Sequence, residues 1–232
     1  MDEKILEKTL GFKITNINLY KNAFVHRSYL NENHSYKGFS NERLEFLGDA
    51  VLQLLTSEFL YLKYTDVQEG ILTSYRSSLV KTTSLAAESK RLGYGEFLVM
   101  SKGEEMGGGK NSEYILANTF EAVLGAMYLD LGLNNARNFL TKNLFYKIDK
   151  IIEEGKYKDA KSKFQEISQA KFGVTPTYKI KKESGPDHNK NFEVGLYLNK
   201  KFIATGNGSS KQKAEIDAAA NGLLKLEEMS SI

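Results

Sequence analysis

Residues 41–52 (NERLEFLGDAVL) constrain the fold more than any other segment of this 232-residue chain. Their acidic members, Glu42, Glu45 and Asp49, are separated by three and then four positions. At about 100° per residue, this spacing places the three carboxylates on one face of a helix, over two turns. Apolar residues fill most of the remaining positions, so we expect the helix to be largely buried. Buried carboxylates repel one another and lose hydration, so a positive charge must compensate for them.

A second predicted helix supplies matching oxygen ligands. Residues 115–130 (ILANTFEAVLGAMYLD) repeat apolar residues at helical spacing and place Asn118 and Glu121 one turn apart. Gly48, inside the first helix, costs about 0.5–1 kcal/mol relative to alanine, which indicates close packing at that point. Two such helices can hold one or two divalent ions between them. The alternative is an ordinary amphipathic helix with a solvated charged face.

Composition narrows the choice of metal. The chain has no cysteine and only three histidines, His26, His34 and His188, which excludes thiolate sites, cysteine nucleophiles and a histidine-rich metal cage. We interpret His26 as a hydrogen-bonded structural residue. Oxygen ligands favour Mg²⁺, with Mn²⁺ as a substitute, and suit phosphoryl transfer. Neither Glu45 nor Glu121 begins a Glu-x-x-His pair, so a helical metal-storage or oxidase protein is disfavoured.

The charge distribution separates the chain into two parts. Residues 1–150 carry 18 Lys and Arg and 18 Asp and Glu, whereas residues 156–214 carry 13 lysines and five acids. Residues 151–158 combine a glycine with several charges and show no apolar period, so we interpret them as a linker. We predict an all-α domain over 1–150 and a second domain over 159–229. The basic character of the second domain favours an anionic partner, the alternative being a solvated lysine-rich surface.

The second domain is predicted to have the element order α-β-β-β-α. Alternation of polar and apolar residues predicts three strands, and Asn199 with Lys200 predicts a tight turn between the last two. No aromatic stacking platform is evident, which disfavours single-strand binding, whereas a basic module of this order suits shape readout of A-form RNA. Helices are expected over 159–172 and 209–228, and strands over 176–183, 191–198 and 201–206.

The start of the last predicted helix is a candidate phosphate site. Lys211 and Lys213 fall in its first turn, after Ser209 and Ser210. Cations are unfavourable at a helix N-terminus unless an anion binds there. The alternative is two solvated lysines. Three further residues are candidates for RNA contacts: Gln165 and Glu166 for sugar hydroxyls, and His188, between the first two strands, for a groove.

These segments together resemble bacterial ribonuclease III followed by a double-stranded RNA-binding domain. The resemblance covers nearly the whole chain in the family's order. In the first domain the matching segments are FVHRSYLNE (24–32), NERLEFLGDAVL (41–52), EGILTSYRSSLV (69–80), LGYGEFLVMSKGEE (92–105) and ILANTFEAVLGAMYLDLG (115–132). In the second they are KFQEISQ (163–169), PTYKI (176–180), GPDHNKNF (185–192) and GNGSSKQKAE (206–215).

The resemblance implies a divalent-metal-dependent endoribonuclease that acts as a homodimer on double-stranded RNA. The family cuts both strands and leaves 5′-phosphate and 3′-hydroxyl ends with short 3′ overhangs. Ribosomal RNA precursors and other structured transcripts are the implied substrates. No organic cofactor is implied.

The resemblance also assigns roles to individual residues. It implies Asp49 and Glu121 as catalytic residues, and Glu45, Asn118 and Glu121 as metal ligands. The carboxylates among them would bind the ion or organise the nucleophilic water.

Three other positions also match the family. Glu42 and Glu69 match acids linked with RNA handling and cleavage-site assembly. Phe46 matches an aromatic residue that inserts into the partner subunit at the dimer interface.

Asn118 departs from the family pattern. The second acidic segment usually contains ADxxEA, whereas this chain has ANTFEA. An asparagine still offers a carbonyl oxygen but removes one negative charge. It is a tolerated natural variant, a change that lowers activity or shifts metal preference, or an engineered substitution; we favour the first because the other acids are intact. The rival function, a double-stranded RNA-binding protein that does not cut, has Asn118 as its support.

The sequence also bears on location. The N-terminal residues MDEKILEKTL are charged and lack the apolar core of a secretory signal, and the chain has no run of about 18 apolar residues. We therefore expect a cytoplasmic protein without a membrane partner.

Overall fold

The computed structural model describes residues 3–155, 157, 160–186 and 190–230. The chain divides into two compact units, Met1–Tyr157 and Lys158–Ile232, and each is described by itself. The described residues include no helix that is both apolar and long enough to cross a membrane.

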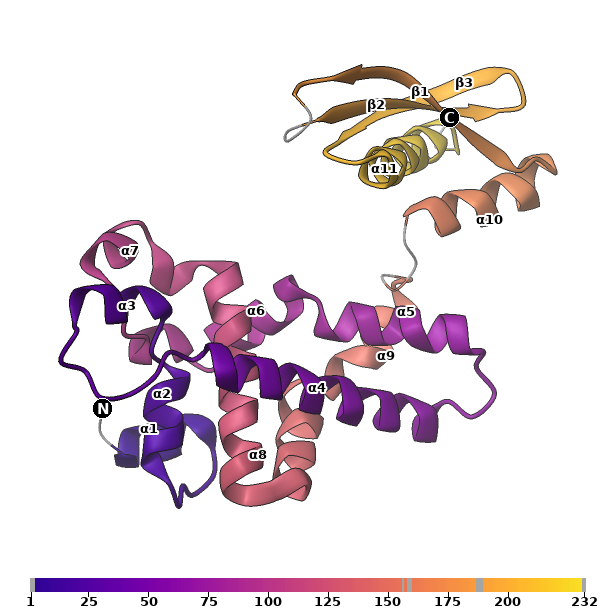
Figure 1. The fold of residues 1–232 in the computed structure, drawn as a ribbon. Coiled ribbons are helices and arrows are strands. Elements are labelled where there is room, and N and C mark those ends of the chain that lie inside the picture. The colour runs from indigo at the N-terminus through magenta and orange to yellow at the C-terminus, as the bar shows by residue number, and fades with distance from the viewer. Residues whose placement is uncertain (1–2, 156, 158–159, 187–189, 231–232) are drawn as a thin grey trace. The chain divides into compact units, whose positions relative to one another are not determined.

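The first unit consists of helices joined by short loops (Figure 1), with an isolated β-bridge between Val25 and Val99. Its α-helices are α1 (Glu3–Leu10), α2 (Ile17–Ala23), α3 (Arg27–Glu32), α4 (Glu42–Lys63), α5 (Glu69–Val80), α6 (Thr82–Arg91), α7 (Lys102–Met106), α8 (Glu113–Asn143) and α9 (Ile148–Glu153). Three short 3-10 turns are η1 (Tyr94–Phe97), η2 (Gly109–Asn111) and η3 (Phe145–Lys147).

Helix α8 is the centre of this unit, and α4 and α6 pack along it. Its buried side chains, including Phe120, Val123 and Leu124, meet the apolar face of α4, whose Leu52 and Leu55 are also buried. This packing is the burial that the apolar periodicity of both segments predicts.

Helix α8 bends at Gly132, whose backbone φ of 79° lies in the left-handed region that favours glycine. Just before the bend, the Asp130 carboxylate accepts hydrogen bonds from the Thr15 backbone N–H at 3.0 Å and the Tyr20 hydroxyl at 3.1 Å. The bend is therefore anchored to the N-terminal part of the unit.

Two glycines allow α4 and α8 to cross with their backbones in contact. A Cβ atom added to Gly48 would lie 1.7 Å from the Glu121 carbonyl oxygen, and one added to Gly125 would lie 2.3 Å from the Leu44 carbonyl oxygen. No side chain fits at either position without moving a helix backbone. The close packing predicted from Gly48 is thus confirmed, and its partner glycine is Gly125.

The prediction that α4 is largely buried is wrong for one of its faces. Phe46 is 81% exposed, and Leu54, Tyr61 and Leu62 are also exposed. The reason is that α4 lies at the edge of the unit, so that this face has no packing partner among the described residues of the unit. An exposed apolar row of this kind is typical of an interaction surface.

The first unit continues beyond residue 150. Ile148 is buried, and α9 runs through Glu153, into the segment that we interpreted as a linker. Tyr157 packs edge-on against Tyr75 of α5, with ring centroids 4.6 Å apart.

The second unit has the predicted α-β-β-β-α order, and the fold class is confirmed. Its three strands pair antiparallel in the order β1-β2-β3, and Figure 1 shows α11 lying along one face of the sheet. Asn199, at φ 54°, makes the predicted turn between β2 and β3. The elements are α10 (Ala160–Phe172), β1 (Pro176–Ser184), β2 (Asn191–Leu198), β3 (Lys201–Gly208) and α11 (Lys211–Ser230).

A small core joins the sheet to its helices. Phe164 of α10 and Leu196 of β2 are fully buried against Ala218 of α11. Gly206 of β3 lies so close to α11 that an added Cβ would meet the Ala218 nitrogen at 2.0 Å. The sheet therefore has one covered face.

Candidate active site

The predicted acidic residues gather where α4 crosses α8. Glu45, Asn118 and Glu121 are half-buried, whereas Glu42 and Asp49 are exposed. Because the helix backbones touch at Gly48 and Gly125, the side chains one turn away on each helix are brought within reach of one another. The structure thus brings together the carboxylates of the two predicted helices.

The carboxylates of the site are partly buried and repel one another. Burial, followed by repulsion from Asp49 and Glu45, raises the pKa of Glu121 from its ordinary value of 4.5 to about 7. Burial also raises the pKa of Glu45, and repulsion from Glu42 adds to this effect. A hydrogen bond with the Asn118 side chain acts in the opposite direction on the Glu45 pKa and favours its carboxylate form. A cation bound here would relieve this repulsion.

A pocket of about 130 Å³ opens beside these residues. It is lined by Glu42 and Glu45 from α4, by Asn118 from α8, and by Arg27 at the start of α3. The Arg27 guanidinium lies 3.4 Å from the Glu42 carboxylate and is mostly exposed. Sequence reasoning missed Arg27, because only the fold brings α3 next to α4.

His26, which also lines this pocket, has a structural role. It caps the N-terminus of α3, where its Nδ1 accepts a hydrogen bond from the Ser28 backbone N–H at 3.4 Å and lies 2.8 Å from the Ser28 hydroxyl. The interpretation of His26 as a hydrogen-bonded structural residue is confirmed.

The donor set at the crossing suits a hard divalent cation. Glu45, Glu121 and Asn118 offer carboxylate and amide oxygens, the ligands that Mg²⁺ and Mn²⁺ prefer. Within the described residues, no group of three His, Cys, Asp or Glu side chains is close enough to form a complete metal site. An ion held here would therefore take part of its coordination from water or substrate.

Glu69 lies apart from this cluster in the single chain. Glu69 begins α5, accepts a hydrogen bond from the Thr73 hydroxyl at 2.9 Å, and lines a hollow with Tyr61. Tyr61 is twelve residues beyond Asp49 on α4, about 18 Å along the helix axis. The structure therefore does not bring Glu69 into the cluster within the single chain.

The predicted RNA-binding residues lie on the second unit. Lys211 and Lys213 are in the first turn of α11, as predicted, and the Ser210 hydroxyl accepts a hydrogen bond from the Lys213 backbone N–H at 3.2 Å. The Lys213 ammonium donates to the Ser209 hydroxyl at 3.1 Å.

Of the other candidates for RNA contacts, Gln165 and Glu166 are exposed on α10. His188 lies outside the described residues.

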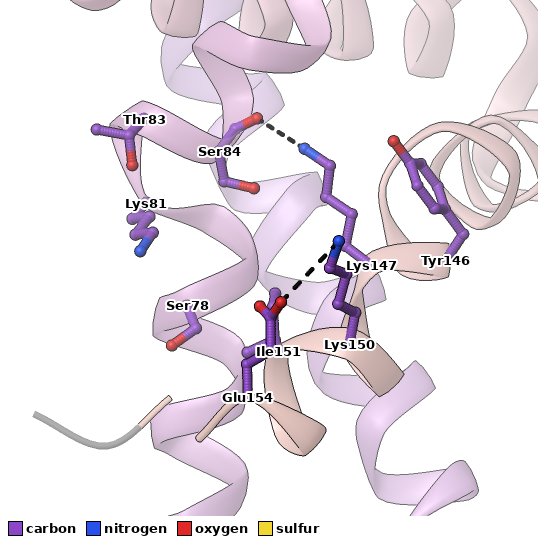
Figure 2. Close-up of a pocket in the computed structure, with 9 residues that line it drawn as sticks. All are labelled: Ser78, Lys81, Thr83, Ser84, Tyr146, Lys147, Lys150, Ile151 and Glu154. Carbon is purple, nitrogen blue, oxygen red and sulfur yellow. Dashed lines mark hydrogen bonds and ion pairs between the residues drawn. The ribbon is translucent and has the colours of Figure 1, made fainter. Parts of the chain in front are cut away.

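A larger cavity, of about 350 Å³, lies between the α5–α6 junction and α9 (Figure 2). Two of its three lysines have partners: Lys147 donates to the Ser84 carbonyl at 3.2 Å, and Lys150 lies 3.9 Å from Glu154. Glu154 is the one carboxylate among its nine lining residues. This cavity therefore lacks the clustered oxygen ligands found at the α4–α8 crossing, and we place the candidate active site at the crossing.

Comparison with known proteins agrees with this architecture. Residues 16–148 match the Ribonuclease-III-like family, and residues 160–226 match the double-stranded RNA binding motif. Proteins named Ribonuclease 3 from Enterococcus faecalis and Dehalococcoides mccartyi are 41% and 40% identical to this chain, over 94% and 98% of its length. The matched regions cover 94% and 96% of those two proteins.

A solved structure is also similar to the first unit. It is the nuclease domain of ribonuclease III from Campylobacter jejuni, described as flexible in a region involved in dimer formation. The match has a TM-score of 0.56 at 37% identity and covers 61% of this chain and 94% of that one. From the sequence matches and the helical architecture together, this chain belongs to the ribonuclease III family of endoribonucleases.

Proposed function

We propose that this chain cleaves double-stranded RNA with a divalent cation, Mg²⁺ or Mn²⁺, at the α4–α8 crossing. The products would have 5′-phosphate and 3′-hydroxyl ends with short 3′ overhangs. Ribosomal RNA precursors and other structured transcripts in the cytoplasm are the proposed substrates. The observation that carries the proposal is the gathering of Glu45, Asn118 and Glu121 where α4 crosses α8, at helix backbones that touch. Burial, followed by repulsion from Asp49 and Glu45, raises the pKa of Glu121 to about 7 there.

We assign roles to the residues at the α4–α8 crossing from their positions there. Glu45, Asn118 and Glu121 would hold the cation, and Asp49 and Glu121 would orient the attacking water. A bound divalent cation would supply positive charge to the scissile phosphate and lower the pKa of water. Because Glu121 retains a proton near pH 7 in the absence of an ion, we expect cation binding to release protons.

Glu42 and Glu69 would act in RNA handling and cleavage-site assembly. Glu42 lies next to the cation ligands and is paired with Arg27. Glu69 begins α5 and lies beside the C-terminal half of α4, near Tyr61, so we propose that it contributes to the site of a partner subunit.

We propose a homodimer that forms through the exposed face of α4. Phe46, Leu54 and Tyr61 lie on α4 at intervals of eight and seven residues, about 2.2 and 1.9 helical turns, so all three fall within about 80° of one another around the helix. Sedimentation of Phe46→Asp should give a monomer where the unchanged chain gives a dimer. A monomeric unchanged chain would refute this part of the proposal.

Asn118 is compatible with cleavage. Burial and repulsion from Glu42 raise the pKa of Glu45, and the hydrogen bond with Asn118 opposes them and favours the carboxylate form, which a cation requires. An aspartate at this position would add a negative charge, strengthening cation binding but also repelling Glu45. We therefore propose that Asn118 is a tolerated ligand, and that Asn118→Asp changes the cation concentration needed for cleavage more than the maximal rate.

The decisive experiment is cleavage of a labelled RNA duplex in Mg²⁺ by the unchanged chain, Glu121→Ala and Asn118→Asp. Glu113→Ala, an exposed acid in the first turn of α8, is the matched control. Discrete fragments that disappear in Glu121→Ala but persist in Glu113→Ala would support the proposal. Intact duplex with the unchanged chain and cleavage by Asn118→Asp would instead support the rival function, an RNA-binding protein that does not cut.

A further inference from the structure

The sheet of the second unit has an open face opposite its helices. Val194, Leu196 and Leu198 of β2 are buried on the covered side. Because side chains alternate along a strand, Gly195 and Tyr197 belong to the open side.

Two β-bulges bring further residues to this face. The pairing passes from Leu196–Ala204 to Tyr197–Phe202, so that Ile203 is an extra residue in β3 and Phe202 lies opposite Tyr197. A second bulge makes Lys181 an extra residue in β1. Bulges re-aim side chains at the expense of ladder hydrogen bonds, and they are frequent at functional sites.

The two rings form a small platform, so the expectation that the second domain lacks one is wrong: the bulge at Ile203 brings Phe202 opposite Tyr197. A Cβ atom added to Gly195 would lie 2.9 Å from the Tyr197 ring, so this ring lies along the sheet over the glycine. Phe202 meets Tyr197 at a centroid distance of 5.6 Å and an angle of 66°, and it is 42% exposed. We call Tyr197, Phe202, Lys179 and Lys181 the outer aromatic face.

The charge of this face is positive. The Lys181 ammonium lies 4.0 Å from the centroid of Phe202, and the Lys179 ammonium lies 5.5 Å from that of Tyr197. In the described part of the chain, neither lysine has a carboxylate partner. Glu193 is the acid that β2 contributes on the same side.

We propose that the outer aromatic face binds single-stranded RNA that flanks a duplex. Bases would stack on Tyr197 and Phe202, while Lys179 and Lys181 turn from the rings to the phosphates. An acidic peptide would satisfy the lysines but leave the rings unused, whereas a nucleotide uses both. This inference rests on the proposed function and extends it to substrates in which a duplex ends in an unpaired tail.

The face does not include the duplex-binding residues proposed above, although α11 reaches its edge, where the Lys225 ammonium lies 5.8 Å from the centroid of Phe202. Those residues lie on α10 and at the start of α11, and α11 lies along the covered side of the sheet (Figure 1). A loss of tail binding can therefore be measured apart from duplex binding.

The test is fluorescence anisotropy of the full chain, without divalent cations so that cleavage is absent. One RNA is a blunt duplex, and the other is the same duplex with a single-stranded tail of about six nucleotides. We expect the tail to raise affinity about tenfold, a gain that Tyr197→Ser with Phe202→Ser removes. Tyr197→Phe should retain the gain, Lys181→Gln should reduce it, and Lys200→Gln, in the exposed β2–β3 turn, is the charge-matched control.

The outcomes separate the two proposals. Unchanged blunt-duplex affinity in the Tyr197→Ser, Phe202→Ser variant would show that the unit is folded, and loss of the tail effect would then support the inference. Equal affinity of the unchanged chain for both RNAs would overturn it and leave the proposed function intact. Binding of poly-glutamate that Tyr197→Ser abolishes, with no tail effect, would overturn it in favour of an acidic protein partner. Failure to bind the blunt duplex would instead count against the proposed function.

Discussion

Replacing Glu121 by glutamine is expected to make the chain more stable at pH 8, although the change removes a residue of the candidate active site. The Glu121 carboxylate is ionised at this pH while half-buried and close to Asp49 and Glu45. Glutamine has nearly the same size and carries no charge. The substitution therefore removes the repulsion and the cost of burying a charge, while keeping the packing between α4 and α8.

The size of the effect follows from the pKa. A rise in pKa from 4.5 to about 7 corresponds to an upper bound of about 3 kcal/mol for ionising Glu121 in the folded state. Water still reaches part of the side chain and screens its charge, so we expect about 1–2 kcal/mol in the free energy of unfolding.

The sign of the pH dependence is fixed by the direction of the shift. The folded state holds the Glu121 proton more tightly than the unfolded state does, so stability falls as pH rises between 4.5 and about 7. Below 4.5 the carboxyl is protonated in both states and the penalty disappears. Glu121→Gln should thus match the unchanged chain at pH 4.5 and exceed it at pH 8.

The assay is urea unfolding followed by circular dichroism at 222 nm, which mainly reports the helical first unit. Glu113→Gln, on the exposed first turn of α8, is the control and should show no comparable pH-dependent gain. Added Mg²⁺ at pH 8 should stabilise the unchanged chain more than Glu121→Gln. Equal stabilities of the unchanged chain and Glu121→Gln at pH 8, without Mg²⁺, would refute the electrostatic reasoning.

Three further predictions concern packing, a buried ion pair and the second unit. Gly48→Ala should destabilise the chain by about 1–3 kcal/mol in urea unfolding and reduce cleavage, because the added Cβ would lie 1.7 Å from a backbone oxygen of α8. The control is Gly70→Ala, where an added Cβ meets nothing within 4 Å, and it should be neutral or stabilising. A larger loss of stability in Gly70→Ala than in Gly48→Ala would contradict the packing argument. Burial alone would raise the pKa of Glu88, but hydrogen bonds from Lys147, Arg91 and Tyr146 outweigh it and hold the pKa below its ordinary value. Glu88→Gln should therefore lower the free energy of unfolding by about 3 kcal/mol at pH 7, and by progressively less as pH falls below 4. A loss of stability that does not change with pH would argue against this ion-pair explanation. A chain ending at Tyr157 should lose RNA affinity at physiological salt but retain slow cleavage at low salt; equal cleavage by both chains at physiological salt would exclude a role for the second unit in affinity.

Much of the helical unit could be predicted from periodicity. Residues 41–52 and 115–130 form two helices that pack together. The apolar spacing that buries one side of each helix also fixes the direction in which its carboxylates point. Gly48 indicated a close approach, since a mid-helix glycine is unfavourable without one. The sequence did not identify Gly125 as the partner of Gly48, because a single sequence does not show which two helix backbones will touch.

Other features depend on contacts between distant segments. Arg27 reaches the pocket only because α3 packs next to α4, 15 residues away from Glu42. Phe46 has the hydrophobicity of a core residue, yet its side chain stays 81% exposed in the part of the chain that the structure describes. In the sheet, strict alternation would place Phe202 on the same side as Ala204, and the bulge at Ile203 reverses that assignment.

The contact between Gly48 and Gly125 has a consequence for how the nuclease can change over evolution. The spacing between the ligand-bearing helices is set by peptide groups touching each other, and peptide groups are identical in every protein. Side chains around the crossing can therefore vary widely in size without moving Glu45 relative to Glu121. Substitutions in the surrounding core then change the packing of other side chains. The distance between Glu45 and Glu121, on which the chemistry depends, is set by the two glycines.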